Sequence, residues 1–364
     1  MVSGGGTAGH VYPALSVIEA LTNLGAPAVT LCWVGSAEGV EKALVRQAGI
    51  PFESIAVSKI RGRNPLAALH GLWTMQRGFW QARRLVAGFR PDVLFVTGGY
   101  VCWPVTLAAW RAGVPLLIYL PDLEPGLAIK SLARFARRVA VTDQAAQRFF
   151  GAGQTVVTGY PVRAGLFSRD RAEARRALGL PADKESVLLV FGGSQGAHSI
   201  NQAVVQGIAQ LLSAAHVVHV TGRRDAPWVQ THRAQLPATW QARYHVYDYL
   251  DAEMVDALVA ADLAIARAGA STLGELPAAG LPAVLVPYPY AGAHQWANAR
   301  WLVHAGAALA VPDQDLASAL VPTVLELLND EPRRTAMSRA ARALARPDAA
   351  RSIAELLCQL ATRG

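Results

Sequence analysis

The chain of 364 residues is 52% hydrophobic and 16% charged, a balance typical of globular proteins that argues against a disordered chain. At about 150 residues per domain, this length predicts two domains. The three cysteines, Cys32, Cys102 and Cys358, are widely spaced without a CxxC pair, which argues against a disulfide framework or a zinc site. No apolar run reaches the roughly 18 residues of a membrane-spanning helix, so we expect a protein that is soluble or peripheral to a membrane.

Positive charge is concentrated in the first part of the chain. The net charge is +8, and residues 1–150 hold 15 Lys and Arg against 8 Asp and Glu, whereas the remainder holds 19 against 18. A basic surface attracts anionic partners. No nucleic-acid motif accompanies it, so the expected partner is an anionic membrane surface and not nucleic acid.

Apolar strand-like runs alternate with helical patterns along the chain, which is typical of parallel sheets built from βαβ units. In the first half, strands are predicted at residues 29–34, 93–97, 116–120, 139–142 and 156–158. In the second half, they are predicted at residues 187–191, 217–221, 244–247, 263–266, 283–287 and 308–311. This order predicts an α/β chain with two doubly wound, Rossmann-like domains.

The first predicted domain spans residues 1–162 and the second spans residues 163–347. Residues 331–364 are predicted to be helical with a break near Pro347. The last helix, at about 348–364, can pack back onto either domain, and we assign it to the first.

Two glycine-rich turns, GGGTAGH at residues 4–10 and GGSQGA at 192–197, each follow an apolar strand and open a helix. Glycines let backbone N–H groups approach a ligand closely, and a helix N-terminus attracts negative charge, so both turns are predicted to bind phosphate. The first turn also fits G-x-G-x-x-G. A nicotinamide site needs an acidic residue at the end of the second strand, where this chain has Trp33-Val34-Gly35-Ser36, so we reject it.

Several longer motifs resemble those of the MurG family of peptidoglycan glycosyltransferases. They are GGGTAGH at 4–10, GGYV at 98–101, GGSQGA at 192–197, RAGASTLGELPAAGLPAVLVP at 267–287 and HQWANA at 294–299. The resemblance implies a GT-B fold, in which two Rossmann-like domains face a central cleft, and catalysis that needs no metal or other cofactor. It implies inverting transfer of N-acetylglucosamine from UDP-N-acetylglucosamine to undecaprenyl-diphospho-N-acetylmuramoyl-peptide (lipid I), giving lipid II, at the cytoplasmic face of the cell membrane.

The resemblance assigns UDP-N-acetylglucosamine to the second domain. Ser194 and Arg163 match residues that contact the diphosphate, and Glu275 matches the glutamate that binds the ribose hydroxyls. Gln295, with His294 beside it, matches a position that contacts the sugar, and Leu250, or else Tyr249, lies near the uracil position. The other residues assigned to the donor are Thr7, Ala8, Gly9, Asp122, Ala270, Ser271, Thr272, Leu273 and Gly274.

The first glycine turn is assigned to the acceptor. Gly6, Thr7 and Gly9 would contact the acceptor diphosphate, and His10 would be the catalytic base, since an imidazole can take the proton of the attacking hydroxyl. The alternative is that His10 only caps or orients the turn. Attack opposite the leaving UDP would invert the anomeric centre.

The chain departs from the family pattern His-Glu-Gln-Asn at residues 119–122, where it reads Tyr-Leu-Pro-Asp. Asp122 replaces an asparagine, and an ionised carboxylate can accept hydrogen bonds but cannot donate them. The alternatives are therefore a related transferase with a different lipid-linked acceptor, a UDP-N-acetylglucosamine 2-epimerase, and a catalytically degenerate UDP-sugar-binding protein. Asp313-Gln314-Asp315 resembles a metal-binding DxD motif, but it precedes a predicted helix, where Asp is a common cap, so we assign it no metal.

Aromatic, aliphatic and basic side chains alternate in one segment of the first domain. The residues predicted to face a membrane are Leu72, Trp73, Phe79, Trp80, Arg83 and Arg84. This mixture suits an amphipathic surface that docks on anionic lipid. The alternative is a buried helix with a solvated basic edge.

Overall fold

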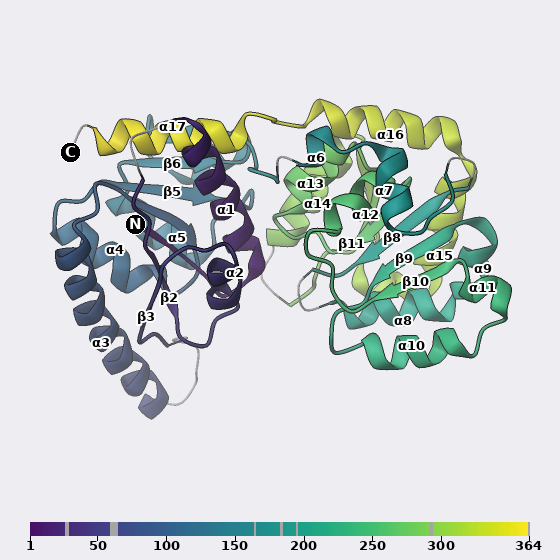
Figure 1. The fold of residues 1–364 in the computed structure, drawn as a ribbon, viewed down its shortest axis with the longest axis horizontal. Coiled ribbons are helices and arrows are strands. Elements are labelled where there is room, and N and C mark those ends of the chain that lie inside the picture. The colour runs from purple at the N-terminus through teal and green to yellow at the C-terminus, as the bar shows by residue number, and fades with distance from the viewer. Residues whose placement is uncertain are drawn as a thin grey trace. The chain divides into compact units, whose positions relative to one another are not determined.

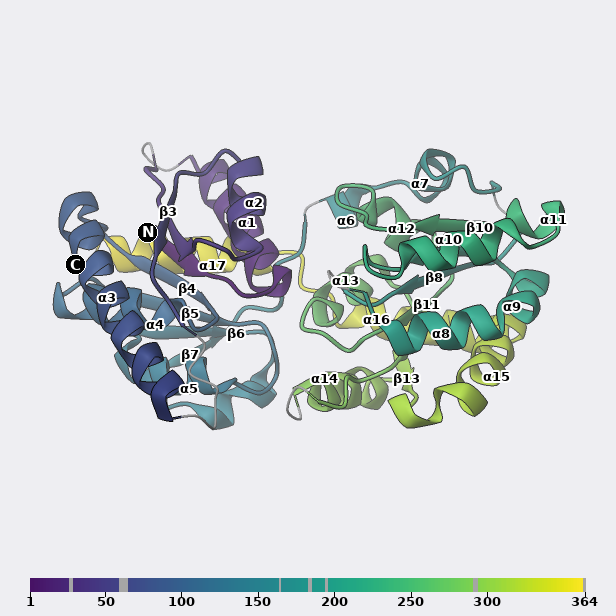
Figure 2. The same ribbon diagram turned by 90° about the horizontal axis from the view of Figure 1, so that it is seen from below.

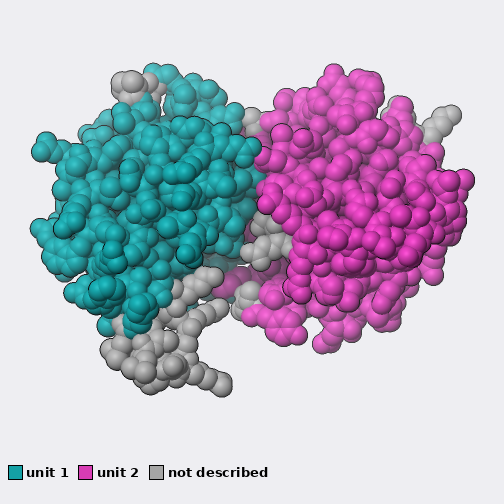
Figure 3. All heavy atoms as spheres, turned by 60° about the horizontal axis from the view of Figure 1, so that its bottom comes forward, with its two compact units in different colours: residues 1–162, 348–364 teal, residues 163–347 magenta. Residues whose placement is uncertain are grey.

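The computed structural model describes residues 1–25, 29–58, 65–163, 165–182, 185–193, 196–290 and 294–362, and in the helix that begins at Pro65 it describes side chains from residue 70. The chain forms two compact units (Figure 3). Unit 1 comprises Met1–Val162 and Asp348–Gly364, and unit 2 comprises Arg163–Pro347.

Unit 1, whose β2, β3, β5 and β6 are labelled in Figure 1, contains a parallel sheet with the order β3-β2-β1-β4-β5-β6-β7 among the described residues. Its strands are β1 (Val2–Gly4), β2 (Trp33–Ser36), β3 (Phe52–Ile55), β4 (Leu94–Gly98), β5 (Leu116–Leu120), β6 (Arg138–Val141) and β7 (Thr155–Val157). Its helices are α1 (Ala8–Asn23), α2 (Glu41–Gln47), α3 (Pro65–Phe89), α4 (Cys102–Arg111), α5 (Leu127–Leu132) and α17 (Ala349–Ala361). Two 3₁₀ turns, at Ala133–Phe135 and Gln144–Phe149, complete the described elements.

Helix α17 returns to unit 1 and packs against α1 (Figures 1 and 2). Its buried residues Ile353, Ala354, Leu357 and Leu360 follow the three- and four-residue spacing of an amphipathic helix. Helix α1 buries Val11, Ala14, Val17 and Ile18 with the same spacing. Burial of these two apolar faces explains why the last segment belongs to unit 1.

Unit 2 contains a second parallel sheet with the order β10-β9-β8-β11-β12-β13 among the described residues. Its strands are β8 (Val187–Phe191), β9 (His216–Val220), β10 (Tyr244–Tyr247), β11 (Leu263–Ala266), β12 (Ala283–Leu285) and β13 (Ala308–Ala310). Its helices are α6 (Gly165–Ser168), α7 (Arg171–Ala177), α8 (His198–Gln206), α9 (Ile208–Ala214), α10 (Ala226–Ala234), α11 (Ala238–Gln241), α12 (Met254–Ala260), α13 (Thr272–Ala279), α14 (His294–His304), α15 (Leu316–Asn329) and α16 (Glu331–Ala343).

In both sheets the order of the strands reverses beside a strand that leads into a glycine turn. In unit 1 the order reverses between β1 and β4, and in unit 2 it reverses between β8 and β11. Ligands of open parallel sheets bind outside the carboxyl ends of the strands at such a switch point. The topology therefore places each glycine turn where a ligand site is expected, and the prediction of two doubly wound α/β domains is confirmed.

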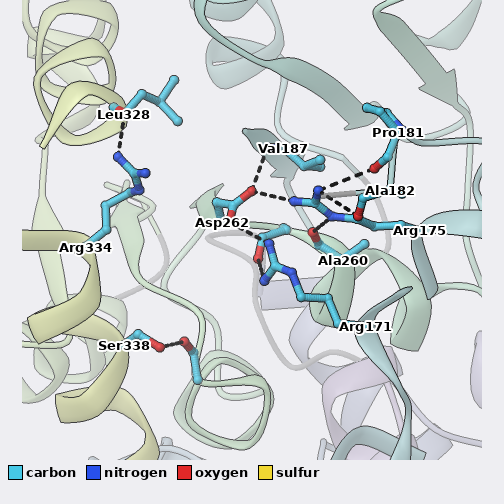
Figure 4. Close-up of polar contacts among 12 residues, drawn as sticks. Arg171, Arg175, Pro181, Ala182, Val187, Ala260, Asp262, Leu328, Arg334 and Ser338 are labelled. Atoms are coloured by element: carbon cyan, nitrogen blue, oxygen red, sulfur yellow. Dashed lines mark hydrogen bonds and ion pairs between the residues drawn. The ribbon is translucent and has the colours of Figure 1, made fainter. Parts of the chain in front are cut away.

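A partly buried ion-pair cluster at the amino ends of the strands of unit 2 ties helix α7 to the sheet (Figure 4). Asp262, directly before β11, forms ion pairs with Arg171 at 2.5 Å and Arg175 at 2.8 Å, and it accepts the backbone N–H of Val187 at 2.8 Å. The Arg175 side chain is only 2% exposed and also donates to the carbonyl of Ala260. The Asp262 carboxylate therefore links the starts of β8 and β11 to helix α7.

Arg175→Ala is expected to destabilise unit 2 by about 1–3 kcal/mol, because the buried Ala260 carbonyl loses its donor and Asp262 keeps only Arg171 as an ion-pair partner. The control is Arg176→Ala at the adjacent exposed position. Chemical denaturation followed by circular dichroism measures both free energies of unfolding. If Arg175→Ala lowers the free energy of unfolding no more than Arg176→Ala does, the cluster does not stabilise unit 2.

Candidate functional site

The first glycine turn connects β1 to α1 at the switch point of unit 1. Gly6 has a positive φ of 85°, a conformation that favours glycine, and Thr7 is the extended N-cap residue of α1. The amides of Thr7, Ala8 and Gly9 follow at the head of the helix, where backbone N–H groups have no partner within the helix. The amide of Gly6 is already engaged, since it donates to the carboxylate of Glu41 at 3.1 Å.

His10 lies in the first turn of α1, and its ring orientation is fixed by β4. Its Nδ1 lies 2.8 Å from the carbonyl oxygen of Thr97, while the Thr97 hydroxyl donates to the His10 carbonyl at 2.7 Å. Because a carbonyl oxygen only accepts, Nδ1 of the neutral ring carries the proton and Nε2 keeps its lone pair. Burial lowers the pKa of His10, and the negative charges of Asp122 and Glu41 oppose this effect. The lowered pKa favours the neutral form of the ring.

Two glycines of the GGYV motif make room for this arrangement. A Cβ atom on Gly98 would lie 2.7 Å from the His10 ring, and one on Gly99 would lie 2.4 Å from the carbonyl oxygen of Gly5. Both glycines have positive φ angles, 123° and 95°. The motif thus lets β4 lie directly against the histidine and the first glycine turn.

The four residues that depart from the family pattern do not share one environment. Tyr119 is fully buried in β5 and its hydroxyl pairs with that of Thr142 at 2.9 Å, and Leu120 and Pro121 are also buried. Asp122 is partly exposed, and it acts electrostatically on His10. Three of the four replacements are therefore accommodated in the interior of unit 1, and Asp122 is the one that reaches the candidate site.

In unit 2, the structure brings together Arg163, Glu275 and the loop that carries Leu250. The Arg163 guanidinium donates to the carbonyl of Asp251 and lies 3.9 Å from a carboxylate oxygen of Glu275. The Glu275 side chain is 12% exposed, and burial raises its pKa although Arg163 opposes this. Leu250 is buried beside Asp251.

Tyr249, the alternative to Leu250, is partly exposed beneath the Arg223 guanidinium, which lies 5.8 Å from its ring centroid. The choice between these two uracil positions stays open.

Glu275 projects from the first turn of α13, whose head is formed by the other matched residues. Ala270 and Ser271 are partly exposed, whereas Thr272 and Leu273 are buried and Gly274 is buried with them. The Thr272 hydroxyl donates to the Gly269 carbonyl at 2.6 Å and holds the turn before the helix.

Gln295 lies in the first turn of α14, and its orientation is fixed. Its side-chain oxygen accepts the backbone N–H of Tyr288 at 2.8 Å, which leaves the amide NH₂ group as a donor for a ligand.

The second glycine turn is described only at its ends. Ser194 and Gln195 lie outside the described residues. Gly193 and Gly196 have positive φ angles of 86° and 75°, and α8 begins two residues after Gly196.

One cluster at this end of the sheet was missed by the sequence analysis. Arg267, directly after β11, forms an ion pair with Asp313 and donates to the Ser199 hydroxyl at 2.8 Å, and its guanidinium lies 5.3 Å from the Tyr288 ring centroid. Asp313 is therefore neutralised by an arginine. Asp315 takes the N-cap position of α15, but its side chain makes no capping hydrogen bond, so that detail of the prediction is wrong.

The predicted membrane-facing residues lie on α3. Leu72, Trp73 and Trp80 are 62%, 59% and 49% exposed, and the Arg83 guanidinium lies 5.2 Å from the Trp80 ring centroid. Phe79 is partly buried, and Arg84 is exposed. An aromatic and basic face is thus open to solvent, whereas Ala82 and Val86 face the core. Among the helices described, none combines the length and apolar character needed to cross a bilayer.

The comparisons with known proteins agree with this arrangement. The family model described as the glycosyltransferase family 28 N-terminal domain matches residues 1–141, and the one described as its C-terminal domain matches residues 187–353. A UDP-N-acetylglucosamine--N-acetylmuramyl-(pentapeptide) pyrophosphoryl-undecaprenol N-acetylglucosamine transferase of Roseiflexus sp. (strain RS-1) is 43% identical over 417 residues, covering 99% of this chain and 94% of the relative.

Solved structures that resemble this chain include two of different activity. The crystal structure of MurG from Acinetobacter baumannii has a TM-score of 0.77 and 29% identity, covering 99% of both chains. A UDP-GlcNAc 2-epimerase from Neisseria meningitidis, bound to UDP-GlcNAc, has a TM-score of 0.67 and 13% identity, covering 98% of both chains. At 13% identity the second likeness shows the fold alone.

Proposed function

Because this chain belongs to glycosyltransferase family 28, and within it to the MurG family, we propose that it transfers N-acetylglucosamine from UDP-N-acetylglucosamine to lipid I and forms lipid II. The fold is GT-B, with a Rossmann-like domain in each unit. The observation that supports this chemistry is the orientation of His10. Its Nδ1 is bound to the Thr97 carbonyl, so the neutral ring keeps a lone pair at Nε2, beside a helix N-terminus suited to a diphosphate.

In the proposed reaction, a hydroxyl oxygen of the acceptor attacks the anomeric carbon of the donor sugar. Nε2 of His10 takes the hydroxyl proton as the new bond forms, and the bond to UDP breaks on the opposite side, so the configuration inverts. The pair of electrons leaves with UDP. The Arg163 guanidinium stabilises the charge that grows on the leaving diphosphate.

The donor is proposed to bind unit 2. Glu275 accepts hydrogen bonds from the ribose hydroxyls; burial raises its pKa, whereas the nearby Arg163 favours the ionised form that accepts on both oxygens. Gln295 donates to the sugar through its free NH₂ group, and Ser194 and the head of α13 complete the proposed site. Asp122 of unit 1 accepts a hydroxyl of the sugar.

The acceptor diphosphate is proposed to bind the amides of Thr7, Ala8 and Gly9. Since the amide of Gly6 donates to Glu41, we leave Gly6 out of the phosphate contacts. The lipid part of the acceptor requires a membrane, so we propose that the protein binds peripherally at the cytoplasmic membrane face through α3.

Replacing Trp73 and Trp80 together with alanine is expected to weaken binding to anionic phosphatidylglycerol vesicles by about 1.5 kcal/mol or more per residue, because each exposed ring would enter the lipid interface. Vesicle cosedimentation measures the effect. The control is Tyr290→Ala, a ring 83% exposed on unit 2. If the control loses as much binding as the double variant, α3 is not the docking surface.

Incubation of the purified protein with labelled UDP-N-acetylglucosamine, with and without lipid I, tests the proposal. We expect a lipid-linked disaccharide only when lipid I is present. UDP-N-acetylmannosamine formed from donor alone would favour the epimerase, and tight UDP binding without any product would favour a degenerate binding protein. Product with another lipid-linked acceptor but not with lipid I would change the acceptor assignment.

A further inference from the structure

Glu41, the first residue of α2, carries a buried carboxylate that none of the motifs includes. Its side chain is completely inaccessible to solvent. One carboxylate oxygen accepts the backbone N–H of Gly6 at 3.1 Å, and the other accepts the backbone N–H and the hydroxyl of Ser36 at 3.0 and 2.7 Å. The carboxylate therefore links the first glycine turn to the end of β2.

Three glycines leave room for this group. A Cβ atom on Gly5 would lie 2.5 Å from the Glu41 carboxylate, and one on Gly39 would lie 2.1 Å from it. A Cβ atom on Gly35 would lie 3.0 Å from the Glu41 Cγ. The first glycine turn, the end of β2 and the loop before α2 thus pack closely against the Glu41 side chain.

The surroundings of Glu41 suit a side chain with two acceptor oxygens. Its three hydrogen-bond partners all act as donors. A glutamine has only one acceptor oxygen, and its NH₂ group would point hydrogen atoms at Gly6 N–H or at Ser36. Leaving a buried donor without an acceptor is costly, so the turn would move away from the amide.

We propose that Glu41 is a positioning residue for sugar transfer: it holds the first glycine turn so that the amides of Thr7–Gly9 and the Nε2 atom of His10 are presented to the acceptor. This inference rests on the proposed function. In this proposal Glu41 acts through the turn, because its carboxylate binds the Gly6 amide. That amide would otherwise be available to phosphate.

The test compares Glu41→Gln with Glu38→Gln, an exposed residue of the same loop. Glu41→Gln is expected to lower kcat/KM for lipid I about tenfold or more, the effect of losing one hydrogen bond to a charged group. The KM for UDP-N-acetylglucosamine and the affinity for UDP should stay unchanged, because unit 2 is untouched. Glu38→Gln should match the wild type in every measurement. Glu41→Asp, which keeps the charge on a shorter side chain, should restore part of the activity, and it replaces Glu41→Gln if that variant does not fold.

Hydrogen–deuterium exchange provides a readout that does not depend on the acceptor. Amide exchange in residues 4–10 is expected to become about tenfold faster in Glu41→Gln, with no change in unit 2. Unchanged exchange in this segment overturns the inference, and so does an equal loss of donor and acceptor affinity. If the wild type shows no transfer to lipid I while the exchange result holds, the proposed function fails and the positioning of the turn stands.

Discussion

Replacing His10 with glutamine is expected to lower kcat for sugar transfer about 100- to 10,000-fold, because the variant has no group that can take the proton from the attacking hydroxyl. Glutamine preserves a donor toward the Thr97 carbonyl, so the first glycine turn should keep its shape. The affinity for UDP, measured by calorimetry, should not change. Steady-state kinetics with lipid I and UDP-N-acetylglucosamine give the measurement, with the exposed His304→Gln as control.

The pH profile gives the same assignment an independent check. Burial lowers the pKa of His10, so the neutral, active ring persists below its ordinary pKa of about 6.5. The acid limb of kcat/KM is therefore expected below that value, with activity falling as pH falls through it. An acid limb that persists unchanged in His10→Gln would show that another group is the base, and His10 would then only orient the turn.

Replacing Glu275 with alanine is expected to weaken UDP binding by about 1.5–3 kcal/mol, roughly 10- to 150-fold, because a charged acceptor of two ribose hydroxyls is lost. The variant also removes the carboxylate that lies 3.9 Å from the Arg163 guanidinium. Calorimetric titration with UDP measures the change. Glu326→Ala, an exposed position of unit 2, is the matched control.

The protonation of Glu275 predicts the direction of the pH effect. Because burial raises its pKa, the carboxylate takes up a proton at a higher pH than an exposed glutamate does. Protonation removes acceptor capacity, so UDP affinity should fall as pH falls through this raised value, and it should do so less in Glu275→Ala. UDP affinity that is equal in wild type and variant would remove Glu275 from the ribose site.

The sequence predicted the strands best where apolar runs are buried on both faces. The predicted ranges 116–120, 187–191 and 263–266 coincide with the buried strands β5, β8 and β11. The range 244–247 also coincides with a strand, the partly buried edge strand β10. Strand β3 was missed, since Phe52-Glu53-Ser54-Ile55 lies at the sheet edge with exposed polar residues in its centre. The strand predicted at 29–34 was found at Trp33–Ser36, where β2 pairs with β3 along its whole length and with β1 at Trp33 and Val34.

The candidate site was predictable where its residues belong to local motifs, and not where they meet through the fold. The glycine turn and His10 are adjacent in sequence, but the tautomer of His10 depends on Thr97, 87 residues away. The role of Glu41 could not be predicted from the sequence for the same reason, since its hydrogen-bond partner Gly6 lies 35 residues earlier. A single carboxylate at a helix start is usually a surface residue, and only the surrounding glycines mark this one as buried.

The most direct measurement of the central claim is the stoichiometry and anomeric configuration of the product. Purified protein is incubated with UDP-N-acetylglucosamine and lipid I, released UDP is counted, and the lipid-linked product is examined by nuclear magnetic resonance. The account predicts one UDP for each disaccharide formed and a β-linked N-acetylglucosamine. UDP release without a disaccharide, or an α-linked product, would contradict it.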